Sequence, residues 1–427
     1  MEKNFIEELK WRGMLQDCMP GVEALLMEGM VSGYVGFDPT ADSLGVGNLV
    51  QIMTLLHFQK AGHKPYALIG GATGMVGDPS GKTQERSLLS EEMLQHNLNC
   101  QKKQLLRFLD FDCGANSAEL INNYDWFRNF SFLDFMRDVG KYLTINYMMA
   151  KDSVQSRMET GMSFTEFSYQ LVQGYDFYYL WKNRGVQLQM GGSDQWGNMV
   201  TGTELIRRKE NGVAFALTTP LIKKADGTKF GKTESGNVWL DAKKTSPYAF
   251  FQFWLNSSDE DSKIYIRIFT LLSKDEITEL ENEHSKAPHL RLLQKSLAKD
   301  VTVRVHSESD YLAALEASEI LFGKGTKESL SKLSESDFLS VFEGVPSSVI
   351  ARKELEGGIN IIEFLSEKSG IFSSKSEARK MLLGGGVAIN KNRVEDVNFH
   401  LNLDELINGK YILVQKGKKN YFVVKAD

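Results

Sequence analysis

The chain has 427 residues, of which 42% are hydrophobic and 25% charged, and its formal net charge is −5. This length predicts two or three domains, and the composition is that of a soluble globular protein. The acidic balance excludes a uniformly basic nucleic-acid binder, so any such partner requires a local basic surface. Three cysteines without metal-ligand spacing favour a reducing cytoplasm and predict neither disulfides nor a protein-bound metal.

Short β-rich runs alternate with longer helical stretches from residue 30 to about 240. The runs are "YVGFD", "YALIG", "VQLQMG" and "AFALTTPLI". This alternation predicts an α/β fold with a parallel sheet, and the stretch around 115–185 reads as a helical insertion between strands. No apolar run approaches the roughly 18 residues that a membrane-spanning helix needs, so we expect no membrane partner.

Two glycine-rich loops follow predicted strands. In "DPTADSLGVGNL", Gly45, Gly47 and Asn48 stand where a helix begins, and small residues there leave backbone N–H groups open to a phosphate. In "GGATGMVGDPSGKT", only three residues separate Gly77 from the Gly-Lys-Thr at 81–83, so the loop is not a Walker A motif. Taken singly, each of these loops is as often a purely structural turn as it is a binding loop.

The segment "SFTEFSYQLVQGYDFYYL" predicts a helix that begins with a capping box of Ser163 and Glu166. Tyr169, Gln173 and Asp176 are spaced to share one face of it, within about 60°. Because the helix also carries large apolar residues, we expect it to be packed. A packed stripe of phenol, amide and carboxylate needs partners, which a polar ligand supplies.

The glycine-rich segment "KKADGTKFGKTESG" predicts a mobile loop with Lys229 and Lys232 three residues apart. Two lysine charges on such a loop suit a polyphosphate, although exposed lysine loops are common.

The remainder of the chain changes character twice. Helical periodicity dominates 247–325, and a Ser-, Lys-, Glu- and Gly-rich connector follows over 326–357. From residue 359 to the end there are 11 Lys and Arg against 8 Asp and Glu, a balance of +3. A small basic module at the end of the chain is therefore expected over 358–427.

Six motifs together carry a family resemblance. They are "YVGFDPTADSL", "GGATGMVGDPSGK", "NYMMAKDSVQSR", "SFTEFSYQLVQGYDF", "QMGGSDQWGN" and "KADGTKFGKT". In this order they resemble the bacterial tyrosyl-tRNA synthetases, which are class I aminoacyl-tRNA synthetases. The segment "SSKSEARKMLLGGGVAINKNRV" is similar to the S4-type RNA-binding module of these enzymes. The resemblance spans nearly the whole chain.

The resemblance implies four regions. It places a Rossmann-like catalytic domain over 1–246, an α-helical anticodon-side domain over 247–325, a linker over 326–357 and a small α+β S4-type domain over 358–427. It also implies an activity. The enzyme would activate L-tyrosine with ATP and Mg²⁺, release pyrophosphate, and transfer tyrosine to the 3′ end of tRNA(Tyr). Family members are homodimers, and the dimer surface would involve the helices around 125–170.

The resemblance assigns roles to individual residues. Tyr34 and Asp176 would bracket the phenolic hydroxyl of tyrosine, and the rest of the tyrosine site would comprise Asp78, Tyr169, Gln173 and Gln195. ATP would be held by Asp38, Gly45, Gly47, Asn48, Lys82, Arg86, Gly192, Asp194, Lys229, Lys232 and Thr233. The RNA-binding residues would be Lys375, Arg379, Lys380, Lys391, Arg393, Lys416, Lys418 and Lys419.

One position departs from the family pattern. The class I signature is usually His-x-Gly-His, and here it reads Gly45-Val46-Gly47-Asn48. Asparagine still donates hydrogen bonds, but glycine has no side chain to contact the ATP phosphates. Losing one charge-directed hydrogen bond costs about 1.5–3 kcal/mol, so we expect reduced activation. The alternative is a synthetase-like RNA-binding factor with weakened or lost tyrosine activation.

Overall fold

The computed structural model describes residues 4–78, 80, 89–155, 161–233, 236–322, 327–342, 345–417 and 420–427. The chain divides into two compact units. The first comprises Met1–Lys244 with Trp254–Val305, and the second comprises Thr245–Phe253 with His306–Asp427. The described residues include no helix that is both long and apolar enough to cross a membrane.

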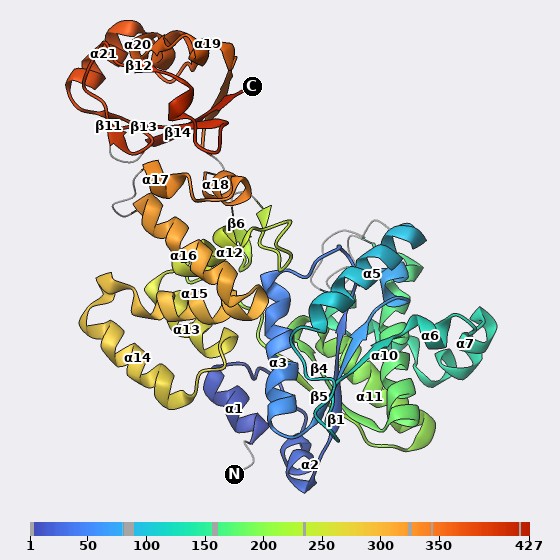
Figure 1. Ribbon diagram of the computed structural model, residues 1–427. Coiled ribbons are helices and arrows are strands. Elements are labelled where there is room, and N and C mark those ends of the chain that lie inside the picture. Colours follow the sequence, from blue (N-terminus) through green and yellow to red (C-terminus); the bar gives the residue numbers. More distant parts are fainter. Residues whose placement is uncertain are drawn as a thin grey trace. The chain divides into compact units, whose positions relative to one another are not determined.

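The first unit is built on a five-stranded parallel sheet in the order β3-β2-β1-β4-β5 (Figure 1). Its strands are β1 (Ser32–Phe37), β2 (Lys64–Ile69), β3 (Glu119–Asn122), β4 (Val186–Gly192) and β5 (Phe215–Thr219). In register, Tyr34 of β1 lies between Tyr66 of β2 and Gln189 of β4. The four strands expected from the sequence are thus confirmed, and β3 is an addition.

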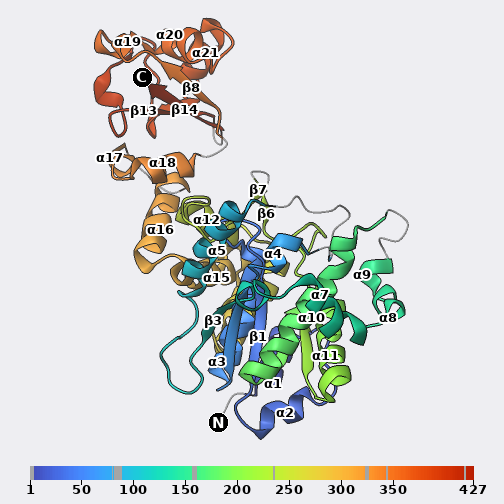
Figure 2. The ribbon, with the colours of Figure 1, turned by 90° about the vertical axis from the view of Figure 1, so that its right-hand side faces the viewer.

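Helices cover both faces of this sheet, as parallel strands require. Figure 1 shows α3 (Leu49–Lys60) on one face and α10 (Phe164–Arg184) with α11 (Trp196–Glu210) on the other. The predicted capping box of Ser163 and Glu166 begins α10. Figure 2 shows the shorter helices before α10 gathered beside it. The other α-helices and strands described between residues 5 and 237 are α1 (Phe5–Arg12), α2 (Val22–Glu28), α4 (Thr73–Val76), α5 (Glu91–Leu105), α6 (Tyr124–Phe127), α7 (Phe132–Asp138), α8 (Ile145–Met149), α9 (Asp152–Gln155), β6 (Lys232–Thr233) and β7 (Gly236–Asn237).

Three helices of the expected anticodon-side domain pack with the first unit instead. They are α13 (Asp259–Phe269), α14 (Lys274–Lys286) and α15 (Leu292–Val305). Arg12 of α1 joins them to the N-terminus, because its buried guanidinium donates to the carbonyls of Arg267, Thr270 and Leu272 at 2.5–2.9 Å. The division into two compact units thus differs from the four regions that the resemblance implies, and those four regions stay a prediction.

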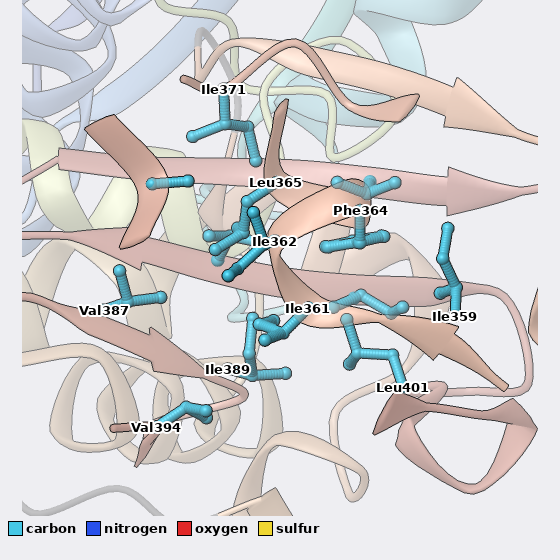
Figure 3. Close-up of a cluster of buried hydrophobic side chains, with 14 of the residues drawn as sticks. Ile359, Ile361, Ile362, Phe364, Leu365, Ile371, Val387, Ile389, Val394 and Leu401 are labelled. Carbon is cyan, nitrogen blue, oxygen red and sulfur yellow. The ribbon is translucent and has the colours of Figure 1, made fainter. Parts of the chain in front are cut away.

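The second unit ends in a mixed sheet in the order β11-β10-β13-β14-β8. Figure 3 shows part of its apolar core, in which Ile361, Phe364, Leu365 and Leu401 are fully buried. Strand β8, inside the expected linker, pairs with β14, so part of that range is ordered. Helix α12 (Pro247–Leu255) belongs to this unit up to Phe253. The unit also contains α16 (Glu308–Phe322), α17 (Lys327–Leu330), α18 (Glu335–Val341), β8 (Ser347–Ile350), α19 (Lys353–Glu356), β9 (Ile359–Asn360), α20 (Ile361–Glu363), α21 (Lys375–Leu383), β10 (Val387–Ile389), β11 (Asn392–Arg393), β12 (His400–Leu401), β13 (Tyr411–Lys416) and β14 (Asn420–Ala426).

Candidate active site

Polar residues gather where four parallel strands end. Asp38 follows β1, Thr73 lies just after β2, Asn123 follows β3 and Asp194 follows β4. In the strand order β3-β2-β1-β4-β5, β2 and β3 lie on one side of β1, whereas β4 and β5 lie on its other side. The order of the strands therefore reverses between β1 and β4. Ligands of open α/β sheets bind in the crevice at this reversal, outside the carboxyl ends of the strands.

A hydrogen-bonded chain runs across this edge of the sheet. The Tyr169 hydroxyl on α10 donates to Asp38 Oδ2 at 2.8 Å, and the Thr73 hydroxyl donates to Asp38 Oδ1 at 2.8 Å. Asn123 Nδ2 then donates to both Thr73 Oγ1, at 3.1 Å, and Asp176 Oδ2, at 3.0 Å. Asp38, which follows β1, and Tyr169 of α10 are thereby connected to a third predicted site residue, Asp176.

The Asp176 end of this series of hydrogen bonds is buried and is suited to a phenolic hydroxyl. Asp176 is only 2% exposed, and its Oδ1 accepts a hydrogen bond from Trp126 Nε1 at 2.9 Å. Burial raises the pKa of Asp176 to about 8, although the hydrogen bonds from Asn123 and Trp126 lower it. The buried Tyr34 hydroxyl finds no hydrogen-bond partner among the described residues, and burial followed by the nearby Asp176 charge raises its pKa.

A separate group of hydrogen bonds surrounds the carboxylates of Asp78 and Asp194. Gln195 Nε2 donates to Asp78 Oδ2 at 2.8 Å and to Asp194 Oδ2 at 3.2 Å. Asp78 Oδ1 accepts from the backbone N–H of Ser80 at 2.9 Å, so the carboxylate is held from both sides. Gln173 on α10 is half-buried, and its Oε1 has no partner in the described part of the chain.

The signature turn (residues 45–48) lies beside the lysine loop (residues 223–236). Val46 N–H donates to the Val238 carbonyl at 3.0 Å. Gly231 packs closely on Val46, since a Cβ at Gly231 would stand 2.9 Å from Val46 Cγ2. Gly231 also has a φ of 80°, which favours glycine. Asn48 Oδ1 accepts from the Gly45 N–H at 3.0 Å. The turn thus presents backbone atoms to the site, with Gly47 open on its outer side.

The remaining predicted ATP-binding residues divide into those that the structure describes and those outside the described ranges. Lys229, Lys232 and Thr233 are exposed, and Gly192 ends β4 beside Asp194. Lys82 and Arg86 lie outside the described residues, as do Lys418 and Lys419 of the predicted RNA surface. Within the described ranges, no group of three or more His, Cys, Asp or Glu side chains could hold a metal ion.

The predicted RNA-binding cations differ in their surroundings. Lys375 pairs with Glu367, Arg393 with Glu395, and Lys416 with Glu377, all at 2.9–3.0 Å. The Lys391 ammonium lies over the Tyr421 ring at 4.7 Å. Arg379 and Lys380, both exposed on α21, make no ion pair within the described ranges, so their charges are the most available for phosphates.

Sequence reasoning missed several residues of the site. Thr73, Asn123 and Trp126 complete the hydrogen-bonded chain, and the buried Gln189 stands beside Tyr34 with an unpartnered Oε1 in the described structure. The one available signal was the run "NNYDW" at 122–126, because polar residues directly after a strand are typical of such sites.

Comparison with known proteins decides the family. A family model described as tRNA synthetases class I (W and Y) matches residues 27–323, and a model of the tyrosine–tRNA ligase SYY-like C-terminal domain matches 337–424. A tyrosine–tRNA ligase of Cytophaga hutchinsonii is 63% identical over 425 residues, covering 99% of both chains. The chain belongs to the tyrosyl-tRNA synthetase family of class I.

Two further likenesses agree with this membership. The tyrosine–tRNA ligase of Porphyromonas gingivalis is 60% identical over 426 residues, covering 99% of each chain. The C-terminally truncated mitochondrial tyrosyl-tRNA synthetase of Aspergillus nidulans is similar in structure, with a TM-score of 0.67 and 31% identity over 75% of this chain and 94% of that one. The Rossmann-like fold expected of a tyrosyl-tRNA synthetase is therefore confirmed.

Proposed function

We propose that this chain is a tyrosine–tRNA ligase, which activates L-tyrosine with ATP and transfers it to tRNA(Tyr). The observation that carries the proposal is the buried pair at the base of the site, the Asp176 carboxylate and the unpartnered Tyr34 hydroxyl. A buried acceptor beside a buried hydroxyl suits a ligand that ends in a hydroxyl group. Phenylalanine would leave the Tyr34 hydroxyl unpaired and would offer Asp176 no further donor, a form of rejection for which the tyrosyl enzymes are themselves the standard example.

The remaining polar groups suit the amino-acid end of the substrate. Asp78 accepts a hydrogen bond from Gln195, the Tyr169 hydroxyl donates to Asp38, and the Gln173 amide oxygen has no partner in the described structure. An ammonium group has three donors and no acceptor, so these oxygens match it. We assign the α-ammonium to Asp78, Tyr169 and Gln173, and place the carboxylate near Gln195.

The first step needs no general base, because the carboxylate of tyrosine is already ionised at pH 7. It attacks the α-phosphate of ATP, a bond forms between carboxylate oxygen and phosphorus, and pyrophosphate leaves. Catalysis then rests on positioning and on stabilising phosphate charge. The backbone of the turn at Gly45, Gly47 and Asn48 and the loop bearing Lys229, Lys232 and Thr233 would attend the phosphates, which enter as the Mg²⁺ complex of ATP.

The adenosine end of ATP would lie against Asp38, Gly192 and Asp194, at the reversal between β1 and β4. Lys82 and Arg86 stay proposed phosphate contacts. In the second step, the activated tyrosine passes to the 3′ end of tRNA, which the basic residues of the C-terminal sheet and α21 would grip.

A homodimer is proposed from exposed apolar side chains in the segment 132–164. Phe132, Leu133, Ile145 and Phe164 expose between 62% and 78% of their surface. Large apolar side chains gathered on so short a segment are typical of a surface that a protein partner covers, and a second copy of the chain is the occupant we propose. We further propose a cytoplasmic location, which suits the three free cysteines at 18, 100 and 113.

The test is tyrosine-dependent exchange of pyrophosphate into ATP by the purified full chain. We expect exchange with tyrosine and none with phenylalanine or tryptophan at equal concentration. No exchange from a folded protein that still binds tRNA would overturn the proposal and leave an RNA-binding factor.

A further inference from the structure

Trp126 reaches the phenol site from a helix that cannot fix it alone. Its indole Nε1 donates to Asp176 Oδ1 at 2.9 Å, which is one of the two side-chain hydrogen bonds found on that carboxylate. Trp126 belongs to α6, a helix of four residues none of which is buried. The indole therefore needs a support outside its own helix to keep Nε1 aimed at Asp176.

Tyr179 supplies that support. Its ring stacks on the Trp126 indole with centroids 4.5 Å apart and planes at 16°. Tyr179 lies three residues after Asp176 on α10, so both side chains leave the same side of the helix. One rigid helix thus carries the carboxylate and also the ring that holds its hydrogen-bond donor.

The neighbouring ring on α10 is not stacked on the indole. Tyr175, also half-buried, packs against Phe127 at 5.4 Å and Phe130 at 5.0 Å, and meets the Tyr179 ring at 6.4 Å with the planes tilted by 47°. No described hydrogen bond uses the Tyr179 hydroxyl, so the ring face rather than the phenol makes the contact with Trp126.

We propose that Tyr179 is a positioning residue that sets the preference for tyrosine over phenylalanine by holding Trp126 against Asp176. The inference rests on the proposed function and deepens it. Without the stacked ring, the indole would lose its alignment, and Asp176 would become a weaker acceptor for the substrate hydroxyl. An aromatic stack is worth about 0.5–1.5 kcal/mol, which corresponds to roughly two- to thirteen-fold in affinity.

The experiment compares Tyr179→Leu, Tyr179→Phe and the matched control Tyr175→Leu, with the wild type, in pyrophosphate exchange. For Tyr179→Leu we expect the KM for tyrosine to rise about two- to thirteen-fold with kcat nearly unchanged. The ratio of kcat/KM for tyrosine over phenylalanine should fall by the same factor, because phenylalanine does not use Asp176. Tyr179→Phe keeps the ring and should retain the wild-type ratio.

The control separates positioning from general packing. Tyr175→Leu removes a similar ring from the same helix and should lower the thermal midpoint while leaving the ratio unchanged. An unchanged ratio in Tyr179→Leu, or an equal fall in Tyr175→Leu, would overturn the inference while leaving the proposed function intact. Failure of the proposed function would show differently, as an absence of tyrosine-dependent exchange in the wild type.

Discussion

Asn123 Nδ2 donates to Asp176 Oδ2 at 3.0 Å, and the same nitrogen reaches Thr73 Oγ1, which donates to Asp38. The buried carboxylate of Asp176 on α10 and the half-buried carboxylate of Asp38 after β1 are therefore connected through the Asn123 amide and the Thr73 hydroxyl. The proposed phenol end at Asp176 and the proposed nucleotide end at Asp38 share these hydrogen bonds, so we expect their properties to be linked.

The pH dependence of tyrosine binding should report Asp176. Burial raises its pKa to about 8, so below pH 8 the carboxyl is largely protonated in the ligand-free protein. A phenolic hydroxyl donates best to the ionised form, and binding below pH 8 must therefore release a proton. Tyrosine affinity should rise by up to about tenfold per pH unit towards pH 8 and level off above it. Calorimetric titration between pH 6 and 8.5 measures this.

The variant Asp176→Asn supplies the control for that profile. It should bind tyrosine more weakly by about 10- to 150-fold near pH 8, since a charged acceptor is lost, and its residual binding should not vary with pH in this window. A wild-type affinity that stays flat from pH 6 to 8 would contradict the raised pKa.

The cost of glycine in the signature turn can be measured with Gly45→His and Gly45→Ala. A Cβ at this position would stand 3.3 Å from the Val238 carbonyl oxygen, so the alanine variant measures the steric effect alone. The histidine variant adds a donor for the ATP phosphates. We expect it to activate tyrosine about 10- to 150-fold faster than the alanine variant in single-turnover kinetics. Equal rates for the two would mean that other groups already fill this role.

RNA binding should depend on Arg379 and Lys380, the exposed cations of α21 that have no ion pair in the described structure. Replacing both with alanine should weaken tRNA binding and reduce its salt dependence by about one unit of slope per lost phosphate contact. Tyrosine-dependent exchange should not change. Lys353→Ala, which removes an exposed lysine of α19, is the matched control. An equal loss of tRNA binding in this variant would indicate a general effect of positive charge rather than a specific role of Arg379 and Lys380.

Much of the fold could be predicted because local sequence patterns specify it. The runs that form β1, β2, β4 and β5 are apolar and bounded by turn residues, and the spacing of Tyr169 and Asp176 placed them on one face of α10. Strand β3 was missed because Glu119–Asn122 is only four residues long and is defined by its pairing with β2.

The partners of the site residues could not be predicted in the same way. Asn123 and Trp126 lie about fifty positions before Asp176, and nothing local in their sequence specifies that contact. The same holds for Arg12, whose hydrogen bonds to residues 267–272 place α13 with the first unit. Contacts across the fold, rather than periodicity, decide such positions.

The structural role of Arg12 has its own test. In Arg12→Met, three carbonyls in and just after the last turn of α13 lose their donor, and Glu8 loses its arginine partner. Breaking a buried charged group of this kind costs about 3–5 kcal/mol, so the thermal midpoint should fall by roughly 10 °C. Arg207→Met, which removes an exposed arginine paired with Glu204, should change it little. Similar midpoints for the two variants would contradict the assigned role.

The central claim is most directly tested by attaching labelled tyrosine to tRNA(Tyr) with the purified full chain, because this requires the tyrosine site, the ATP site and the RNA surface together. We expect tyrosine to be attached in the presence of ATP and Mg²⁺ and phenylalanine not to be attached. We expect Asp176→Asn to lose most of the rate. Binding of tRNA without any attachment of tyrosine would contradict it.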